Sequence, residues 1–295
     1  MKILPIIISI IFINIFSPAF SQNQSKPNVV ARYDDADEYL PQIQANNKNN
    51  RRLFLRQQKN ELLFKVLTPR NVLVDVIYNI PENSDTAVIL LVGASGVLSI
   101  VNDRLDRSFS FQSRSRDEWW KHGIATFIVD APSDKLGKSG MAPEFRITKD
   151  HLSDLQSVIS EIRKKFNGKL IVYGHSRGAI SAALIASSNN SQIVGYVFSS
   201  ADYNTENSYS KIFNQTYNNP VIIVQHKNDK CASSTAAKFT LLDRNINTSK
   251  KDVIWINGEI ENFGNPCGAW VPHSFFGQEA EVISRIAASI KSNVK

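Results

Sequence analysis

The chain has 295 residues, with 34 Lys and Arg against 27 Asp and Glu, and a formal net charge of +7 at pH 7. Acidic residues lie among the basic ones, as between Arg104 and Glu118, and no basic stripe with interleaved aromatic residues occurs. We therefore expect no nucleic-acid partner, and a chain of this length suits one large domain.

The first 21 residues have the pattern of a secretory signal peptide. Lys2 is followed by an apolar stretch over residues 3–16, and the small residues Ala19 and Ser21 precede Gln22. The stretch is too short to span a membrane comfortably, and no second long apolar segment follows. The sequence thus predicts an exported protein, periplasmic or secreted, with no integral membrane segment after signal cleavage.

Residues 22–59 are polar, with an acidic cluster at 34–38 and an Asn-rich stretch at 46–50. We interpret them as an N-terminal arm docked on the body, helical near residues 51–58, rather than as a domain. The main domain is then expected over residues 60–295.

Apolar runs bounded by turn residues predict the strands and helices of the main domain. A β-hairpin is expected first, from strands at 62–67 and 72–80 joined by Thr68–Asn71. The next elements are, in chain order, strands at 87–92 and 124–130, a helix at 148–166, a strand at 170–173, a helix at 179–186, strands at 193–198, 220–226 and 251–257, and a helix at 278–291. Strands that alternate with helices indicate an α/β fold with a mostly parallel sheet covered on both faces.

The pentapeptide Gly174–Gly178 lies between the strand at 170–173 and the helix at 179–186. It has the form G-x-S-x-G, and the glycines on both sides of Ser176 permit a sharp turn that bulkier side chains would obstruct. Such a turn exposes the serine hydroxyl, and the helix N-terminus behind it stabilises negative charge. The strand–turn–helix context favours a nucleophilic serine over a tight turn that holds a serine by chance.

A nucleophilic serine needs a base, and an acid that orients the base. Asp229 follows a late buried strand, and His273 lies in a loop after the last strand. Asp202, which follows the preceding strand, is the alternative acid. The chain order Ser176, Asp229, His273 is that of the α/β-hydrolase arrangement rather than of chymotrypsin-like or subtilisin-like enzymes.

With the sharp turn at Ser176, called a nucleophile elbow, and with this order of acid and histidine, residues 60–292 resemble the α/β-hydrolase superfamily. They are most similar to compact lidless members, such as dienelactone hydrolases and the catalytic domains of acyl-peptide hydrolases. The resemblance implies a serine hydrolase that acts on an ester, thioester or amide. It also implies an oxyanion hole made by the backbone N–H of Arg177 and by a second N–H from the loop after the strand at 87–92. The family usually has His-Gly there, whereas this chain has Gly93-Ala94, so the second donor is Ala94 or Ser95, unless the glycines merely make a turn.

The other four histidines receive no catalytic role. We interpret His175 as a structural residue that packs inside the elbow, and His226 as a residue that shapes the loop carrying Asp229, the acid loop. His122 and His151 lie in helix-like segments and are expected at the surface or at helix caps.

The connection from Phe198 to Pro220 is polar and too short for a helical cap domain. A longer insertion, Val97–Arg116, is the candidate cover for the acyl or alcohol pocket. Its apolar residues include Leu98, Ile100, Val101, Phe109 and Phe111. A lidless site favours small or exposed substrates over interfacially activated lipase chemistry.

The two cysteines lie close in sequence to the acid and the histidine. Cys231 follows Asp229, and Cys267 precedes His273. In the assigned fold both loops converge at the carboxyl ends of the strands, so we expect a disulfide, with two buried free thiols as the alternative. Its loop of about 36 residues would contribute on the order of 3–4 kcal/mol in the chain-entropy model.

The leading hypothesis is an exported carboxylesterase that forms an acyl-enzyme on Ser176, with His273 as general base and Asp229 as the orienting acid. It would act on a small or exposed ester or amide, without a cofactor or a metal ion. One alternative is a serine peptidase or amidase acting on envelope material. The other is a non-catalytic α/β-hydrolase-like binding protein, although such proteins usually lack one of these three residues.

Overall fold

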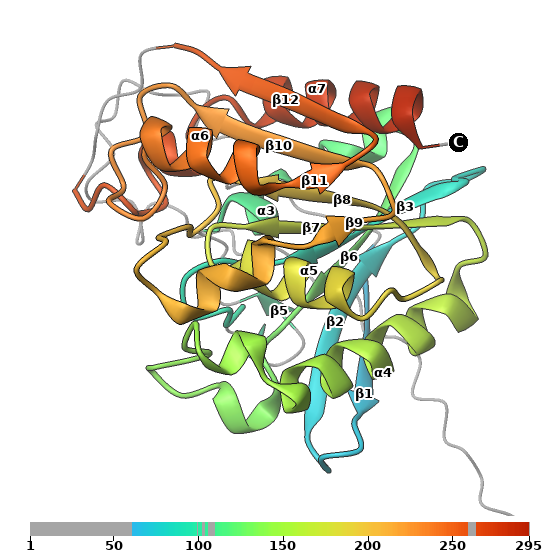
Figure 1. The fold of residues 1–295 in the computed structure, drawn as a ribbon. Helices are drawn as coiled ribbons and strands as arrows, with labels where there is room; N and C mark the ends of the chain where they lie inside the picture. The colour runs from blue at the N-terminus through green and yellow to red at the C-terminus, as the bar shows by residue number, and fades with distance from the viewer. Residues whose placement is uncertain (1–60, 99, 102–103, 106–109, 259–263, 295) are drawn as a thin grey trace, which may run out of the picture.

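The computed structural model describes residues 61–98, 100–101, 104–105, 110–258 and 264–294. The expected signal peptide and polar arm, together residues 1–59, lie outside these ranges, as does Phe109 of the expected insertion. Figure 1 shows the described chain arranged around one large central sheet.

The central sheet has eight strands in the order β1-β2-β6-β3-β7-β8-β10-β12. β1 (Leu62–Leu67) and β2 (Leu73–Asn79) form the expected antiparallel hairpin, and β2 runs antiparallel to β6. All other neighbouring strands are parallel: β6 (Ile124–Val129), β3 (Thr86–Leu91), β7 (Lys169–His175), β8 (Ile193–Ser199), β10 (Val221–His226) and β12 (Lys251–Ile256). The structure thus confirms an α/β fold with a mostly parallel sheet.

Helices cover both faces of this sheet (Figure 1). One face packs against α4 (Lys149–Lys165), α5 (Gly178–Ser187) and α6 (Ala236–Asn245), and the other against α3 (Phe111–Ser115) and α7 (Glu279–Asn293). Because neither face is open to water, β3, β6 and β10 are buried along their whole length. This burial explains their largely apolar sequences.

The remaining elements are short. The 3-10 helices are η1 (Trp119–His122), η2 (Ser133–Lys135), η3 (Phe145–Ile147), η4 (Ser208–Phe213) and η5 (Pro272–Ser274). Two-residue strands pair β4 (Ile100–Val101) with β5 (Arg104–Leu105), and β9 (Thr216–Tyr217) with β11 (Asn247–Thr248). The connection between β8 and β10, described throughout, holds only η4 and β9, which confirms that no large cap domain is inserted there.

The expectation that His151 lies at the surface or at a helix cap is wrong for its side chain. His151 lies in the first turn of α4, and only its backbone takes part in the cap, by donating its N–H to Thr148. Its side chain is buried against α5, where Nε2 lies 2.9 Å from Oγ of Ser181. The buried face of α4 includes position 151 together with Leu155 and Val158, and sequence alone favoured the solvent face for a polar side chain.

The carboxyl ends of β3, β7, β8 and β10 lie at one edge of the sheet because these strands are parallel neighbours. The loops that follow them carry Ala94, Ser176, Asp202 and Asp229. Ligand sites of open α/β sheets form at this edge. No helix in the described ranges is both long enough and apolar enough to cross a membrane.

Candidate active site

Ser176 occupies a sharp turn between β7 and α5. Its φ of 52° lies in the left-handed region, which is uncommon for a residue with a side chain. The flanking glycines make the turn possible, because a Cβ on Gly174 would lie 2.3 Å from the carbonyl oxygen of Gly178, and a Cβ on Gly178 would lie 1.9 Å from that of Leu91. The sequence G-x-S-x-G therefore has the strand–turn–helix geometry of a nucleophile elbow.

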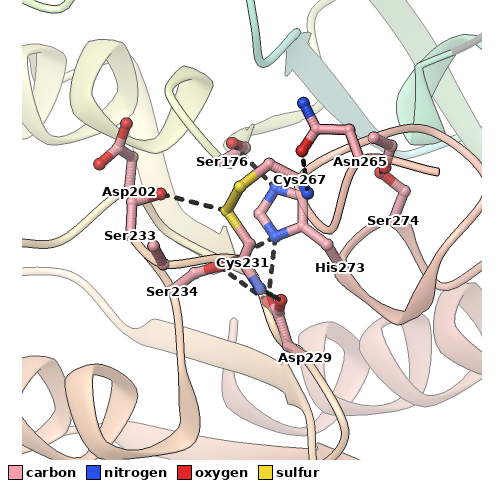
Figure 2. Close-up of a disulfide and its surroundings, with 12 residues drawn as sticks. Ser176, Asp202, Asp229, Cys231, Ser233, Ser234, Asn265, Cys267, His273 and Ser274 are labelled. Atoms are coloured by element: carbon pink, nitrogen blue, oxygen red, sulfur yellow. Dashed lines mark hydrogen bonds and ion pairs between the residues drawn. A yellow bond between two sulfur atoms is a disulfide. The ribbon is translucent and has the colours of Figure 1, made fainter. Parts of the chain in front are cut away.

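His273 and Asp229 lie beside this serine, although they are far from it in sequence (Figure 2). Nε2 of His273, in η5, is 3.1 Å from Oγ of Ser176, and its Nδ1 is 3.0 Å from Oδ2 of Asp229. His273 is 1% exposed and Asp229 5% exposed, so water competes little for these contacts. The structure thus joins the three expected residues in one hydrogen-bonded path.

Asp202, the alternative acid, has different partners. Its Oδ2 lies 3.4 Å from Nε of Arg177, and its Oδ1 accepts a hydrogen bond from the hydroxyl of Tyr209 at 3.3 Å. The carboxylate of Asp229, in contrast, accepts from the backbone N–H of Cys231 and from Nε2 of Gln225, both at 2.8 Å. The geometry therefore supports Asp229 as the acid that contacts the histidine.

Ser234 is a member of this network that the sequence analysis missed. Its Oγ lies 2.8 Å from Oδ2 of Asp229 and 2.9 Å from Nδ1 of His273. A carboxylate can only accept, so the hydroxyl proton of Ser234 goes to Asp229, and its oxygen accepts from the Nδ1–H of His273. With the proton on Nδ1, the lone pair of Nε2 faces Ser176. No sequence pattern singles out this loop serine.

The three candidate oxyanion donors lie around the elbow. Arg177 precedes the first residue of α5, and Ala94 and Ser95 form a turn closed by a 2.8 Å hydrogen bond from the N–H of Gly96 to the carbonyl of Gly93. A Cβ on Gly93 would lie 2.9 Å from Cβ of Ser176, so this turn packs directly on the serine. Within the described ranges, the N–H groups of Arg177, Ala94 and Ser95 have no hydrogen-bond acceptor.

A cavity of about 300 Å³ opens beside Ser176 and His273. One side is formed by the insertion after β3, and the other by the loop that carries the histidine. The lining residues from these two segments are Val97, Leu98, Ser110, Phe111, Ser113, Cys267, Gly268, Ala269 and Ser274. Neither a lysine or arginine nor a carboxylate is among the described lining residues.

A disulfide joins Cys231 of the acid loop to Cys267 of the histidine loop, as expected. The two Cα atoms are 4.6 Å apart, and Cys267 also lines the cavity. Figure 2 shows the bond beside the ring of His273. It therefore links covalently the two loops that supply the acid and the histidine.

Arg114 holds the histidine loop from the side of α3. This buried side chain forms an ion pair with Glu279, the first residue of α7, and Nη2 donates to the carbonyl oxygen of Ser274. The partner carbonyl belongs to the residue directly after His273. A buried pair of this kind is costly to break, since either charge alone would remain in a dry environment.

His175 and His226 have structural partners. Nδ1 of His175 lies 2.9 Å from Oγ of Ser199, and burial holds the pKa of its imidazole well below the usual range. Nδ1 of His226 accepts the backbone N–H of Asn228 at 3.0 Å, and burial lowers its pKa too. His122 is half-buried at the end of η1. In the described part of the chain, no group of three or more His, Cys, Asp or Glu side chains is arranged to hold a metal ion.

Comparisons with known proteins agree with this fold. A family model described as serine aminopeptidase, S33, matches residues 96–253, whereas no sequence among the curated proteins matches the chain. Among solved structures, a cold-adapted esterase from an Arctic intertidal metagenomic library is 16% identical, with a TM-score of 0.58 over 81% of this chain and 94% of that one.

Two other solved structures show the same fold. The esterase of Pyrococcus furiosus is 15% identical, with a TM-score of 0.56 over 79% of this chain and 92% of that one. Est1E of Butyrivibrio proteoclasticus, solved with ferulic acid bound, is 14% identical, with a TM-score of 0.55 over 78% of this chain and 98% of that one. Since the family model covers more than half of the chain, the protein belongs to the serine aminopeptidase S33 family of the α/β-hydrolase superfamily and is a serine hydrolase.

Proposed function

We propose that the protein is an exported carboxylesterase that cleaves small, uncharged esters through an acyl-enzyme on Ser176. The observation that carries the proposal is the hydrogen-bonded path from Asp229 through His273 to Ser176, which ends at a cavity whose described lining residues include no Lys, Arg, Asp or Glu. Such a path activates a serine hydroxyl, and the cavity offers room for the acyl or alcohol group beside it.

The geometry allows each step to be assigned to a residue. His273 takes the hydroxyl proton of Ser176 through Nε2 as the serine attacks the ester carbonyl, and Asp229 stabilises the imidazolium that forms. The N–H of Arg177 and that of Ala94 or Ser95 stabilise the oxyanion. His273 then returns the proton to the leaving alkoxide, and a water molecule, activated in the same way, hydrolyses the acyl-enzyme.

The lining of the cavity favours esters over the peptides that the family description suggests. An aminopeptidase binds the free ammonium group of its substrate, for which a carboxylate is the usual partner. None of the described lining residues is an Asp or a Glu. We therefore expect p-nitrophenyl butyrate to be cleaved with a much higher kcat/KM than alanine p-nitroanilide, and the reverse order would support the aminopeptidase.

Reaction with a fluorophosphonate tests the catalytic part of the proposal, because only an activated serine reacts. We expect one label per chain, located on Ser176 by mass spectrometry of a digest, and no label in Ser176→Ala. That variant should also lose at least about 10³-fold in kcat. Labelling of another residue, or an active Ser176→Ala, would contradict the mechanism.

Export is supported by two features of the chain. The apolar stretch 3–16 before Gln22 has the pattern of a signal peptide, and disulfides such as that of Cys231 persist in oxidising compartments. The N-terminal sequence of protein recovered from the periplasm or the medium should start at Gln22. Protein that remains in the cytosol with Met1 or Lys2 at its N-terminus would contradict export.

A further inference from the structure

Arg146, in η3, is a buried cation that the proposed mechanism does not use. Its side chain is 1% exposed, and the described residues that hydrogen-bond to it are all neutral. Nη1 donates to Oγ of Ser181 at 3.0 Å, and Nη2 donates to the carbonyl oxygens of Val92 at 3.2 Å and Ala94 at 3.3 Å. Burial, with repulsion from Arg177, lowers the pKa of Arg146 to about 9, although attraction to Asp202 opposes the shift, and the guanidinium stays charged at neutral pH.

The groups that hydrogen-bond to Arg146 are neutral dipoles, and the nearest countercharge, Asp202, acts on it only through space. Ser181 Oγ also contacts Nε2 of His151 at 2.9 Å, and burial lowers the pKa of that imidazole to about 3, so it is neutral. A buried charge without a directly paired countercharge opposes folding by several kcal/mol. Such a destabilising feature is expected mainly at functional sites, where proteins accept a loss of stability.

The two carbonyl groups that Arg146 contacts belong to the turn beside Ser176. In a trans peptide the N–H points away from the carbonyl oxygen, so a bond that fixes the carbonyl of Ala94 also fixes the direction of the Ser95 N–H. The guanidinium reaches this turn because Gly96 has no side chain, as a Cβ there would lie 2.6 Å from Nη2.

We propose that Arg146 is a positioning residue for the oxyanion. It holds the Val92–Gly96 turn at its carbonyl groups, and its charge polarises the peptide group between Ala94 and Ser95, which strengthens the N–H of Ser95 as a donor. A fixed donor in a site of low dielectric stabilises the charge that develops in the transition state, and polarisation passes along hydrogen-bonded chains. The inference rests on the proposed function and assigns the second oxyanion donor to Ser95.

Arg163 provides a matched control. Its guanidinium also donates to backbone carbonyl groups, those of Phe166, Gly168 and Gln192. These carbonyls lie at the amino ends of β7 and β8, at the opposite edge of the sheet from Ser176. Both Arg146→Gln and Arg163→Gln remove a guanidinium that binds backbone carbonyl groups, but only Arg146→Gln removes it from the turn beside Ser176. A comparison of the two variants therefore isolates the effect of the position.

The experiment measures kcat and KM for p-nitrophenyl acetate, and the Ki of an alkyl trifluoromethyl ketone, whose adduct with the serine carries an oxyanion. Since removal of an oxyanion donor lowers kcat by about 10²–10³-fold, we expect Arg146→Gln to lower kcat by about 10–100-fold. Its KM should change little, and the Ki should rise in proportion to the loss in kcat/KM. Arg163→Gln should keep the wild-type kcat and Ki, even if its melting temperature falls.

Arg146→Lys keeps the charge but lacks the planar fork, so its kcat and Ki should lie between those of the wild type and Arg146→Gln. If the Gln variant does not fold, the Lys variant compared with Arg163→Lys carries the test. Wild-type kcat and Ki in both folded Arg146 variants would overturn the inference. Fluorophosphonate labelling of Ser176 in the wild type tests the proposed function separately from the role of Arg146. A wild type that is not labelled would contradict the proposed function, whatever the Arg146 variants do.

Discussion

The hydroxyl oxygen of Ser234 lies 2.9 Å from Nδ1 of His273, so the histidine shares its Nδ1 proton between this serine and Asp229. Both acceptors are buried, so water competes little for either hydrogen bond. Two acceptors at one N–H hold the ring plane more firmly than one, and they favour the tautomer whose Nε2 accepts the proton of Ser176.

We expect Ser234→Ala to lower kcat with little change in KM. Hydrogen bonds to charged groups contribute about 1.5–3 kcal/mol, which corresponds to a loss of about 10–100-fold in rate. Steady-state kinetics with p-nitrophenyl acetate measures the effect, and Ser233→Ala, which changes the neighbouring serine outside the His273 contact, is the control. Equal kcat values for the two variants would show that Asp229 alone orients the histidine.

Asp229→Asn should impair turnover far more than Asp202→Asn. The amide can offer its NH₂ group to Nδ1 and so favour the wrong tautomer of His273, and the loss of the corresponding charge in a serine protease triad lowers kcat by about 10⁴-fold. Asp202 contacts Arg177 and Tyr209 instead, so its replacement should leave kcat near that of the wild type. The opposite ranking in a pair of kcat measurements would reassign the acid to the loop after β8.

Much of the fold could be predicted from the sequence, because strands buried on both faces have a distinctive composition. β6 and β10 are almost uninterrupted apolar runs, and the elbow is marked by two glycines that its geometry requires. α6 was missed because only Phe239 and Leu242 of this helix are buried, too few to give a clear helical period.

The supporting residues of the site could not be predicted, because their roles come from contacts between distant segments. Ser234 meets His273 across 39 positions, Arg146 meets Val92 across 54, and Arg114 meets Ser274 across 160. Each is a common polar residue in a segment without a motif. The nucleophile differs from them, since the constraints on Ser176 are local and leave a local sequence pattern.

The disulfide between Cys231 and Cys267 should stabilise both the fold and the site. We expect Cys231→Ser to lower the free energy of unfolding by on the order of 3 kcal/mol in the chain-entropy model, and to lower kcat as the acid and histidine loops separate. Thermal melts and steady-state kinetics with and without dithiothreitol measure both effects, and the variant itself should not respond to the reductant. Two alkylatable thiols in unreduced, denatured wild-type protein would contradict the bond.

Asp130 should make the stability of the protein fall as the pH rises. Burial raises the pKa of this carboxyl to about 6, although the N–H groups of Leu98 and Ala131 oppose the shift. A folded-state pKa above the unfolded value of about 4 means that the folded form binds the proton more tightly. The stabilisation is therefore complete below pH 4 and is lost as the pH rises through 6.

Asp130→Asn keeps an oxygen that accepts both N–H groups but removes the charge. We expect the variant to melt at a higher temperature than the wild type at pH 8, and the difference to shrink by pH 4. A shift of about two pKa units corresponds to roughly 3 kcal/mol as an upper bound. A difference in melting temperature that does not change between pH 4 and pH 8 would show that Asp130 does not titrate in this range.

The last prediction concerns the length of the acyl group. No cap domain covers Ser176 from the connection between β8 and β10, and the cavity of about 300 Å³ is at the small end of the range for ligand sites. We expect kcat/KM to be higher for acetyl and butyryl esters than for palmitoyl esters, with no increase in rate when the substrate forms an interface. Val97, Leu98 and Phe111 line the cavity and stabilise each enclosed methylene by up to about 0.8 kcal/mol, but only as far as the cavity extends. A kcat/KM that rises steadily from acetyl to palmitoyl would instead indicate a long apolar groove along the insertion and a lipase-like activity.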